Sequence, residues 1–135
     1  MSHIERKNPS DVYPPYNNVY TQVIRAKGTV EVHVAGTVSL DIHRNLVGEG
    51  DMRLQTKTTM ENIGRSLVAF GAKPSDVVRV NIFTLDVDRY LQEGHQELVA
   101  FFGQDTLPTS TLVGCTRLAD PRYLVEIEAT AILTH

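Results

Sequence analysis

Apolar and polar side chains alternate along the last part of the chain. One set of residues is apolar and points to one side of this segment: Val125, Ile127, Ala129 and Ala131. The intervening set points to the other side: Glu126, Glu128 and Thr130. This period of two predicts a strand with one face in the core. The glutamate face also carries Leu124 and Ile132, so we expect it to be partly enclosed, and an enclosed carboxylate is either paired or chemically used.

Other segments also have strand patterns. Residues 110–113 follow Pro108, which has no backbone N–H and suits the entrance of a strand, so they predict a short strand at the protein's edge. Residues 77–85 are apolar on both faces and predict a central strand. Residues 19–26 and 29–35, joined by Lys27–Gly28, predict a β-hairpin.

Two segments have the period of an amphipathic helix. The first is expected to begin near Asp51, whose carboxylate can cap the first turn, and to end before Gly71 and Pro74. Its apolar stripe consists of Met60, Ile63, Leu67 and Phe70. The second follows the turn at residues 86–88 and ends at Gly103. The residues that share its inner face are Leu91, His95, Leu98 and Phe102.

The predicted order is β-β-α-β-α-β-β, which indicates a single α+β domain over residues 1–135 with an extended N-terminal segment at residues 1–15. Two helices packed on one face of a mixed sheet form a stable pair of layers. The other face needs a cover as well, because it would carry apolar side chains at Phe83, Leu85, Leu124 and Ile132. We therefore expect a closed homo-oligomer with the glutamate face near the subunit boundary.

Composition narrows the classes of function. The formal net charge of the 135 residues is −3, and no basic stretch is long enough to follow a phosphate backbone, so nucleic acid is not expected as a partner. No apolar run is long enough for a membrane span or a signal peptide, and Cys115 is the only cysteine. We expect a cytoplasmic protein. The five histidines lack the spacing of a metal site, so no metal is expected.

Several short motifs follow one another along the chain in a recognisable order. They are Tyr20-Thr21-Gln22, Ala35-Gly36, Gln55, Asn62-Ile63, Phe70-Gly71-Ala72, Asp76-Val77-Val78, Phe101-Phe102, Leu107-Pro108 and Val125-Glu126-Ile127-Glu128-Ala129. Together they cover residues 16–132 and resemble the reactive-intermediate deaminase family, called Rid or YjgF. The resemblance implies a chorismate-mutase-like fold and a homotrimer with ligand clefts between subunits.

The resemblance also implies an activity. Family enzymes hydrolyse short-lived imines and enamines to ketones and ammonia without a cofactor, and the first glutamate of the final strand handles the attacking water. Glu126 holds that position in this chain, and Tyr20, Ala35 and Gly36 match positions that line the pocket. A structural role for Glu126 in an intersubunit ion pair is the alternative.

The chain departs from the family pattern at the group that binds the substrate. The usual Pro-Ala-Arg-Ser reads Pro108-Thr109-Ser110-Thr111, so Ser110 stands where an arginine would grip a carboxylate. An asparagine of the second helix is replaced by His95. His95, when protonated, and the loop arginines Arg117 and Arg122 are candidates to supply the missing charge. The remaining expected substrate-binding residues are Thr111 and Leu112.

Simpler roles exist for each of these residues. Ser110 can be an inert small residue, a hydrogen-bonding contact or, least favoured, a nucleophile. His95 can be a core histidine, and Arg117 a loop arginine in solvent. Three functions follow: an imine or enamine deaminase with an atypical substrate, a trimer that binds a small metabolite without catalysis, and a ribonuclease or translation inhibitor. The acidic balance disfavours the last.

Overall fold

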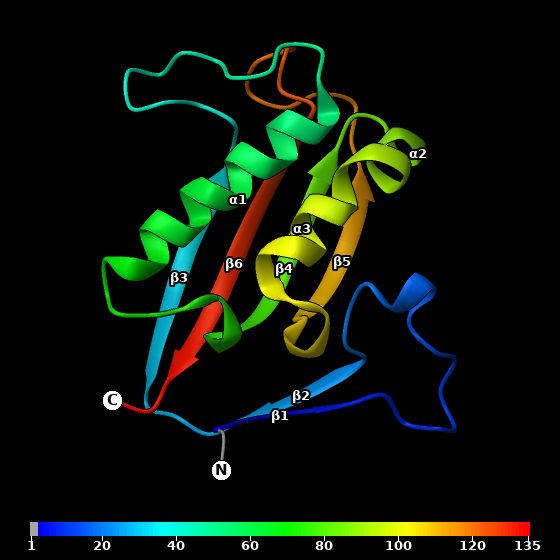
Figure 1. Cartoon of the computed structure of the whole chain (residues 1–135), viewed down its shortest axis with the longest axis vertical. Coiled ribbons are helices and arrows are strands. Elements are labelled where there is room, and N and C mark those ends of the chain that lie inside the picture. Colours follow the sequence, from blue (N-terminus) through cyan, green and yellow to red (C-terminus); the bar gives the residue numbers. More distant parts are fainter. Residues whose placement is uncertain (1–2) are drawn as a thin grey trace.

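The main sheet is built around two central strands in the computed structural model, which describes residues 3–135 (Figure 1). β4 (Val77–Thr84) and β6 (Val125–Leu133) pair antiparallel, and among residues 3–135 the order of the main sheet is β3-β6-β4-β5. β3 (Val30–Thr37) is antiparallel to β6 at one edge. β5 (Thr109–Gly114) is parallel to β4 at the other, as expected for an edge strand after Pro108. The sheet is therefore mixed.

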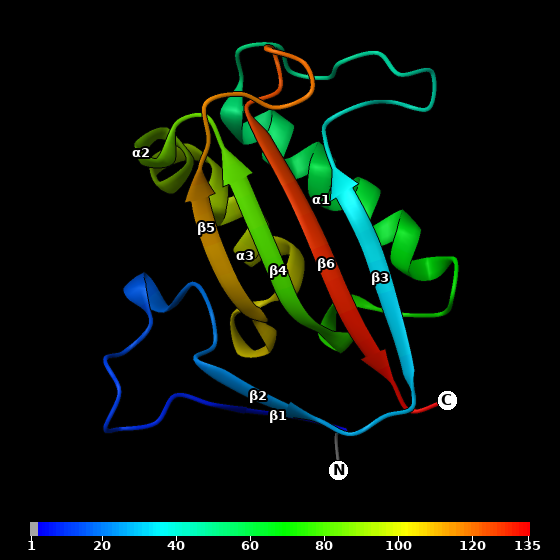
Figure 2. The same ribbon diagram turned by 180° about the vertical axis from the view of Figure 1, so that it is seen from behind.

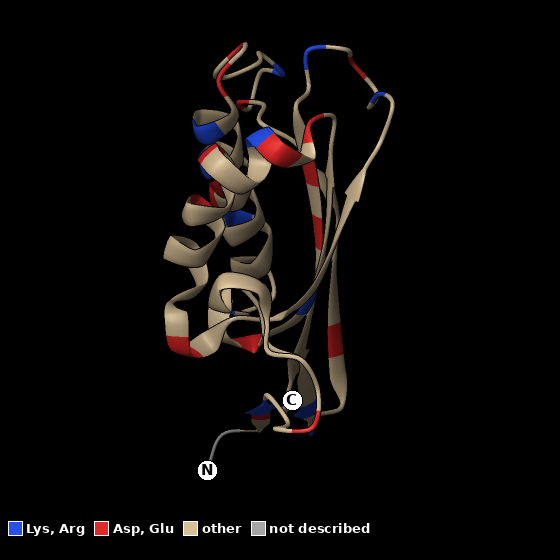
Figure 3. Ribbon diagram, turned by 90° about the vertical axis from the view of Figure 1, so that its right-hand side faces the viewer, with Lys and Arg blue, Asp and Glu red and all other residues tan. Residues whose placement is uncertain are grey.

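The helices lie on one face of this sheet, and the opposite face is bare (Figures 1 and 2). α1 (Met52–Val68) begins where the Asp51 carboxylate accepts a hydrogen bond from the Leu54 N–H at 3.0 Å. A second helix runs from α2 (Val87–Arg89) through the π-helical turn η3 (Tyr90–Gly94) into α3 (His95–Phe102). The view along the edge shows the two layers, helices on one side and strands on the other (Figure 3). The α+β fold with two layers is as predicted.

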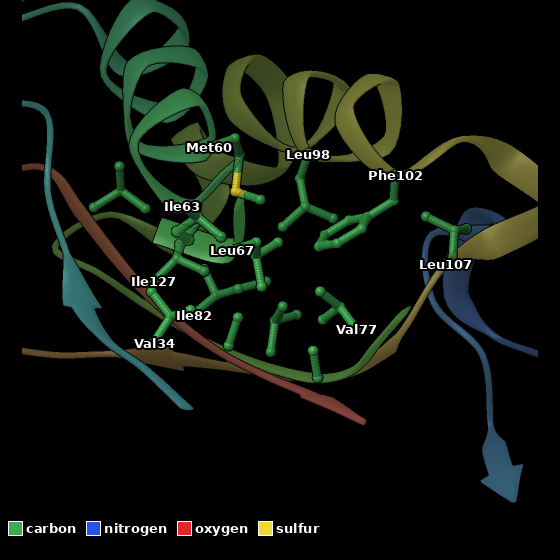
Figure 4. Close-up of a cluster of buried hydrophobic side chains, with 14 of the residues drawn as sticks. Val34, Met60, Ile63, Leu67, Val77, Ile82, Leu98, Phe102, Leu107 and Ile127 are labelled. Atoms are coloured by element: carbon green, nitrogen blue, oxygen red, sulfur yellow. The ribbon is translucent and has the colours of Figure 1, made fainter. Parts of the chain in front are cut away.

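The core lies between these layers, where apolar side chains from both meet (Figure 4). The helices contribute Met60, Ile63, Leu67, Leu98 and Phe102, all buried. β6 contributes every second residue, namely Val125, Ile127, Ala129 and Ala131, and β4 contributes Val77, Val80 and Ile82. The alternation in residues 125–131 thus determines which face of β6 packs against the helices, and it leaves Glu126, Glu128 and Thr130 on the bare face.

The predicted hairpin between residues 19–26 and 29–35 is wrong. β2 (Val23–Ala26) pairs with an N-terminal strand that was not predicted, β1 (Ile4–Lys7), while β3 pairs with the last strand of the protein. Gly28 serves a different purpose from a hairpin turn, because a Cβ there would lie 2.3 Å from the Leu133 carbonyl oxygen. Lys27–Gly28 is a close crossing over the end of β6. Met1 and Ser2, part of the expected extended segment, lie outside the described residues.

Two details of the helices also differ from expectation. Phe70 lies beyond the end of α1 and is 76 % exposed, so it is not part of the buried stripe. The second helix is interrupted by the wide turn η3, whose Gly94 allows close packing: a Cβ there would lie 2.8 Å from the Thr56 hydroxyl of α1. Short 3₁₀ turns complete the chain: η1 (Tyr16–Asn18), η2 (Pro74–Asp76) and η4 (Gln104–Thr106).

The buried amide of Gln55 ties α1 to the start of β6. Its Nε2 donates to the carbonyls of Gly48 at 3.0 Å and Arg122 at 3.1 Å, and its Oε1 accepts from the Leu124 N–H at 2.9 Å. All three of these groups belong to loops or strand ends that have no sheet partner at that point. Gln55 therefore fixes where the glutamate-bearing strand begins.

We predict that Gln55→Leu lowers the free energy of unfolding by about 2–4 kcal/mol, because three backbone groups lose their partners at once. Urea denaturation at a single protomer concentration measures it. Gln96→Leu, on the exposed face of α3, is the matched control and should change the free energy by less than about 0.5 kcal/mol. An equal loss in the two variants would contradict the role given to Gln55.

Candidate functional site

Glu126 lies over a bulge in the neighbouring strand. β3 pairs with β6 at Val34–Ala129 and again at Thr37–Ile127, so β3 has one extra residue in the stretch that contains Ala35 and Gly36. Gly36 makes room for the carboxylate, since a Cβ at that position would lie 2.5 Å from the Glu126 Oε2. The carboxylate is half-buried, and among residues 3–135 it has no hydrogen-bonding partner. It is free to act on a bound molecule.

The other polar groups of the bare face are paired with each other. Asn81 donates from Nδ2 to the Glu128 Oε1 at 2.8 Å, and the Arg79 guanidinium donates to the Thr111 hydroxyl. Arg79, Asn81 and Glu128 border a shallow hollow of about 410 Å³ in the middle of the sheet. The two glutamates thus differ: Glu128 has an amide partner, whereas the Glu126 carboxylate packs against Gly36.

Two of the three predicted substrate-binding residues on β5, Ser110 and Leu112, lie on the helix side of the sheet. Ser110 and Leu112 pair in register with Val80 and Ile82, which face the helices. They border a cavity of about 470 Å³ between β5, the second helix and the N-terminal segment. Tyr20, His95 and Thr111 border the same cavity. The structure therefore brings together five of the predicted residues.

Tyr20 reaches this cavity because the next residue is anchored to the start of β5. The Thr21 hydroxyl donates to the Leu107 carbonyl at 2.6 Å, and its N–H donates to the Pro108 carbonyl at 3.1 Å. Tyr16 and Val19 from the same segment also line the cavity, as do Tyr90 and Leu91 from the second helix. Sequence reasoning missed Tyr16, Val19 and Tyr90. Of these four residues, only Leu91 belongs to the apolar stripe predicted for the second helix.

His95 enters the cavity from the turn where η3 gives way to α3. Its Nδ1 is shielded from solvent and has no hydrogen-bonding partner in the described chain. Burial lowers the pKa of the His95 imidazole below its ordinary value of 6.5, so the ring is neutral near pH 7. His95 therefore does not supply the charge of the missing arginine.

Arg117, another candidate for that charge, lies on the loop between β5 and β6 and is exposed. Its guanidinium donates to carbonyls of its own loop, those of Leu118 at 3.1 Å and Ala119 at 3.2 Å. It borders neither the cavity nor the hollow on the bare face. The Arg122 side chain is likewise engaged, with the Asp120 carboxylate at 2.9 Å.

The candidate residues thus form two groups on opposite faces of the sheet. Glu126, Ala35 and Gly36 are on the bare face, and the cavity with Ser110 and His95 is on the helix side. A single copy of the chain cannot bring the carboxylate to the cavity, because the sheet separates them. One molecule could contact both groups only if two copies of the chain were placed side by side.

The chain is similar to proteins of known families. The model of the family described as endoribonuclease L-PSP matches residues 12–133. A RutC family protein of Pyrococcus abyssi is 32% identical over 114 residues, which cover 83% of this chain and 84% of that protein. A 2-iminobutanoate/2-iminopropanoate deaminase of the mite Dermatophagoides farinae is 27% identical, covering 84% and 85%. The solved structure of YyfB, a Rid family protein of Yersinia pestis, superposes with a TM-score of 0.91 at 29% identity, covering 97% and 99%.

Two kinds of feature are absent from residues 3–135. No helix there is long and apolar enough to cross a membrane. No group of three or more His, Cys, Asp or Glu side chains in that range is arranged to hold a metal ion.

The contact between Gly36 and Glu126 generates a prediction. Gly36→Ala should lower the free energy of unfolding by about 1 kcal/mol, because the new methyl group displaces the carboxylate. The loss should largely disappear in a Glu126→Ala background and persist in a Glu128→Ala background. Chemical denaturation of the double-mutant cycle measures it, and an equal loss in both backgrounds would show that the contact is not what glycine accommodates.

The neutral state of His95 leads to a prediction about the pH dependence of stability. Well above pH 6.5 the imidazole is uncharged in the folded and the unfolded chain alike. As pH falls below that value the unfolded chain binds the proton first, so the His95 contribution to the free energy of unfolding decreases until the folded pKa is passed. Titration by NMR should show a His95 pKa below 6.5. His95→Gln should remove part of the pH slope between about pH 7.5 and about pH 5.5, and His43→Gln, on an exposed loop, controls for the loss of a histidine.

Proposed function

Because this chain belongs to the endoribonuclease L-PSP family, which includes Rid (YjgF) proteins, we propose that it hydrolyses a reactive imine or enamine to a carbonyl compound and ammonia. The site would be completed by two neighbouring subunits of a homotrimer. The mite relative, whose name states 2-iminobutanoate/2-iminopropanoate deaminase activity, supports this reaction class. The substrate differs from those compounds because Ser110 stands where the family places a carboxylate-binding arginine.

One observation carries the proposal: Glu126 is unpaired on the bare face of the sheet, while the cavity opens on the other. In the proposed assembly, the bare face of one copy lies against the cavity side of the next. Contacts between unlike surfaces generate rings when the rotation closes, and three copies would form such a ring with equivalent sites. The apolar residues Phe83 and Leu124 on the bare face would be covered by the same contact.

The chemistry requires only water and a carboxylate. Glu126 accepts a proton from the water as the water oxygen bonds to the imine carbon, and the C=N electron pair moves to nitrogen. Glu126 gives this proton to the nitrogen, which forms a neutral carbinolamine, and then transfers the proton of the carbinolamine hydroxyl to the amino group. The C–N bond then breaks, with release of ammonia and formation of the C=O bond. Imine and water thus give carbonyl compound and ammonia, and the carboxylate is regenerated.

A binding function without catalysis is the alternative, and the chemistry of the cavity favours it at one point. Ser110 offers a single neutral hydrogen bond where an arginine would offer two charged ones. If catalysis depends on that arginine to orient the substrate, the chain would retain only the pocket. Loss of imine in the presence and absence of protein separates the two functions.

We predict that the wild type shortens the lifetime of at least one imine in a panel generated in situ by amino-acid and amine oxidases and followed by semicarbazide trapping. Glu126→Gln should lower this rate by about 100-fold or more, because the carboxylate both removes and returns a proton. Glu128→Gln, two residues along the same face, should lower it by less than about tenfold. A panel in which no imine decays faster with wild type would leave the binding function.

Mixing two defective variants tests the division of the site. Glu126→Gln removes the carboxylate, and Ser110→Trp blocks the cavity. Refolding from equal amounts should recover activity in about a quarter of all sites, because one of the three sites in each mixed trimer combines the intact carboxylate of one chain with the intact cavity of the other. Equal numbers of each variant kept apart should stay inactive. Absence of recovery in trimers shown to be mixed would place the whole site within one chain.

A further inference from the structure

The cavity on the helix side of the sheet is unusually apolar for a site that is expected to take a small charged metabolite. Apolar side chains from three parts of the chain form its walls: Val19, Ile82, Leu91, Leu98 and Leu112. Tyr16, Tyr20 and Tyr90 add aromatic rings. The volume of about 470 Å³ is within the range of sites for small organic ligands, which bury most of the ligand's surface.

The cavity also lacks a positive charge. No Lys or Arg is among its described lining residues, and Arg117 and Arg122 bond to groups of their own loop. His95, its only ionisable group besides the tyrosines, is neutral near pH 7. A carboxylate placed here would lose its hydration and gain no opposite charge, which is strongly unfavourable.

Polar atoms at the cavity nevertheless lack hydrogen-bonding partners. The Ser110 hydroxyl makes no hydrogen bond within the described chain, and the His95 Nδ1, which is buried beneath the cavity surface, also lacks a partner there. The hydroxyl and the neutral imidazole can each donate or accept. A ligand that forms a hydrogen bond with the Ser110 hydroxyl is therefore favoured over one that is wholly apolar.

We propose that this cavity binds an uncharged molecule with an aromatic or branched apolar side chain and a single polar group, and rejects its carboxylate-bearing counterpart. This inference rests on the proposed function, for which the ligand is then an imine derived from an amine and not from an amino acid. The polar group, the imine nitrogen or the carbonyl oxygen of the product, bonds to Ser110 or His95. The side chain fills the space between Tyr20 and Leu98.

The proposed neighbour strengthens this preference. Its bare face would present Glu126 to the mouth of the cavity, together with the ring of Phe83, which pairs with Glu126 in register. A substrate carboxylate would then meet a second carboxylate with no cation between them, and like charges at short distance repel. An uncharged imine has no such conflict, and the Glu126 carboxylate can accept a proton from water.

Binding tests the ligand class without reference to catalysis. Phenylacetone and phenylpyruvate share ring and ketone and differ in the carboxylate, and calorimetry on the full-length protein gives both dissociation constants. We expect phenylacetone to bind at least about tenfold more tightly. Equal affinities, tighter phenylpyruvate or binding of neither ligand would overturn the inference.

Ser110→Arg should reverse the preference, because the new guanidinium provides the charge that a carboxylate needs. Ser66→Arg, on the exposed face of α1, adds the same charge away from the cavity and should leave the preference unchanged. Ser110→Lys serves the same purpose if the arginine variant does not fold. A reversal in Ser66→Arg would mean that net charge, and not the cavity, sets the selectivity.

Catalysis is tested with the corresponding imines. An amine oxidase acting on phenethylamine and an amino-acid oxidase acting on phenylalanine generate imines that differ at the carboxylate. We expect the wild type to accelerate decay of the first at least about tenfold more than the second. If phenylacetone binds preferentially and neither imine decays faster, the proposed function fails and the ligand class stands. If only the phenylalanine-derived imine is hydrolysed, the deaminase reaction stands and the ligand class fails.

Discussion

The alternation of side chains along a strand is the constraint on which the site depends. Neighbouring residues in a strand point to opposite faces, so the helix-facing set on β6 leaves Glu126 on the bare face, and the same rule on β5 sends Ser110 to the helix side. No adjustment of side chains within one chain brings these groups together. A carboxylate and a cavity separated by a sheet become one site only through association, and the fold thereby links any activity at that site to the assembly of the protein.

Most of the main sheet could be predicted from local patterns. β4 and β6 have strong periodic signals, and Asp51 marked the start of α1, because these depend on residues close in the sequence. β1 and the partner of β2 could not be found in this way. Their pairing joins Ile4 with Ala26, and Gly28 is required by the end of β6 more than a hundred residues later. A glycine that permits a distant crossing is indistinguishable, in sequence, from a glycine in a hairpin turn.

The candidate site was predictable only in part, because local motifs identify some of its residues and the fold alone brings in the others. Glu126, Gly36 and the residues around Ser110 were identified from a resemblance, and the structure places them in the two groups described above. The cavity's apolar character was not predictable, because it depends on Tyr16 and Val19 from the N-terminal segment and on the wide turn η3 that carries Tyr90. The charge state of His95 likewise follows from its burial, which no local pattern reveals.

The N-terminal segment has a consequence for how the protein is made. Arg6 donates to the carbonyls of Ser75 and Leu107, and Thr21 is held by Leu107 and Pro108, so the wall containing Tyr20 is fastened to segments translated much later. The partner of β3 is synthesised later still, because it is the final strand, β6. Contacts between distant parts of a chain form slowly and late. On the ribosome, therefore, Thr21 cannot reach its partners until Leu107 and Pro108 have been synthesised, and β3 cannot pair until β6 has been made.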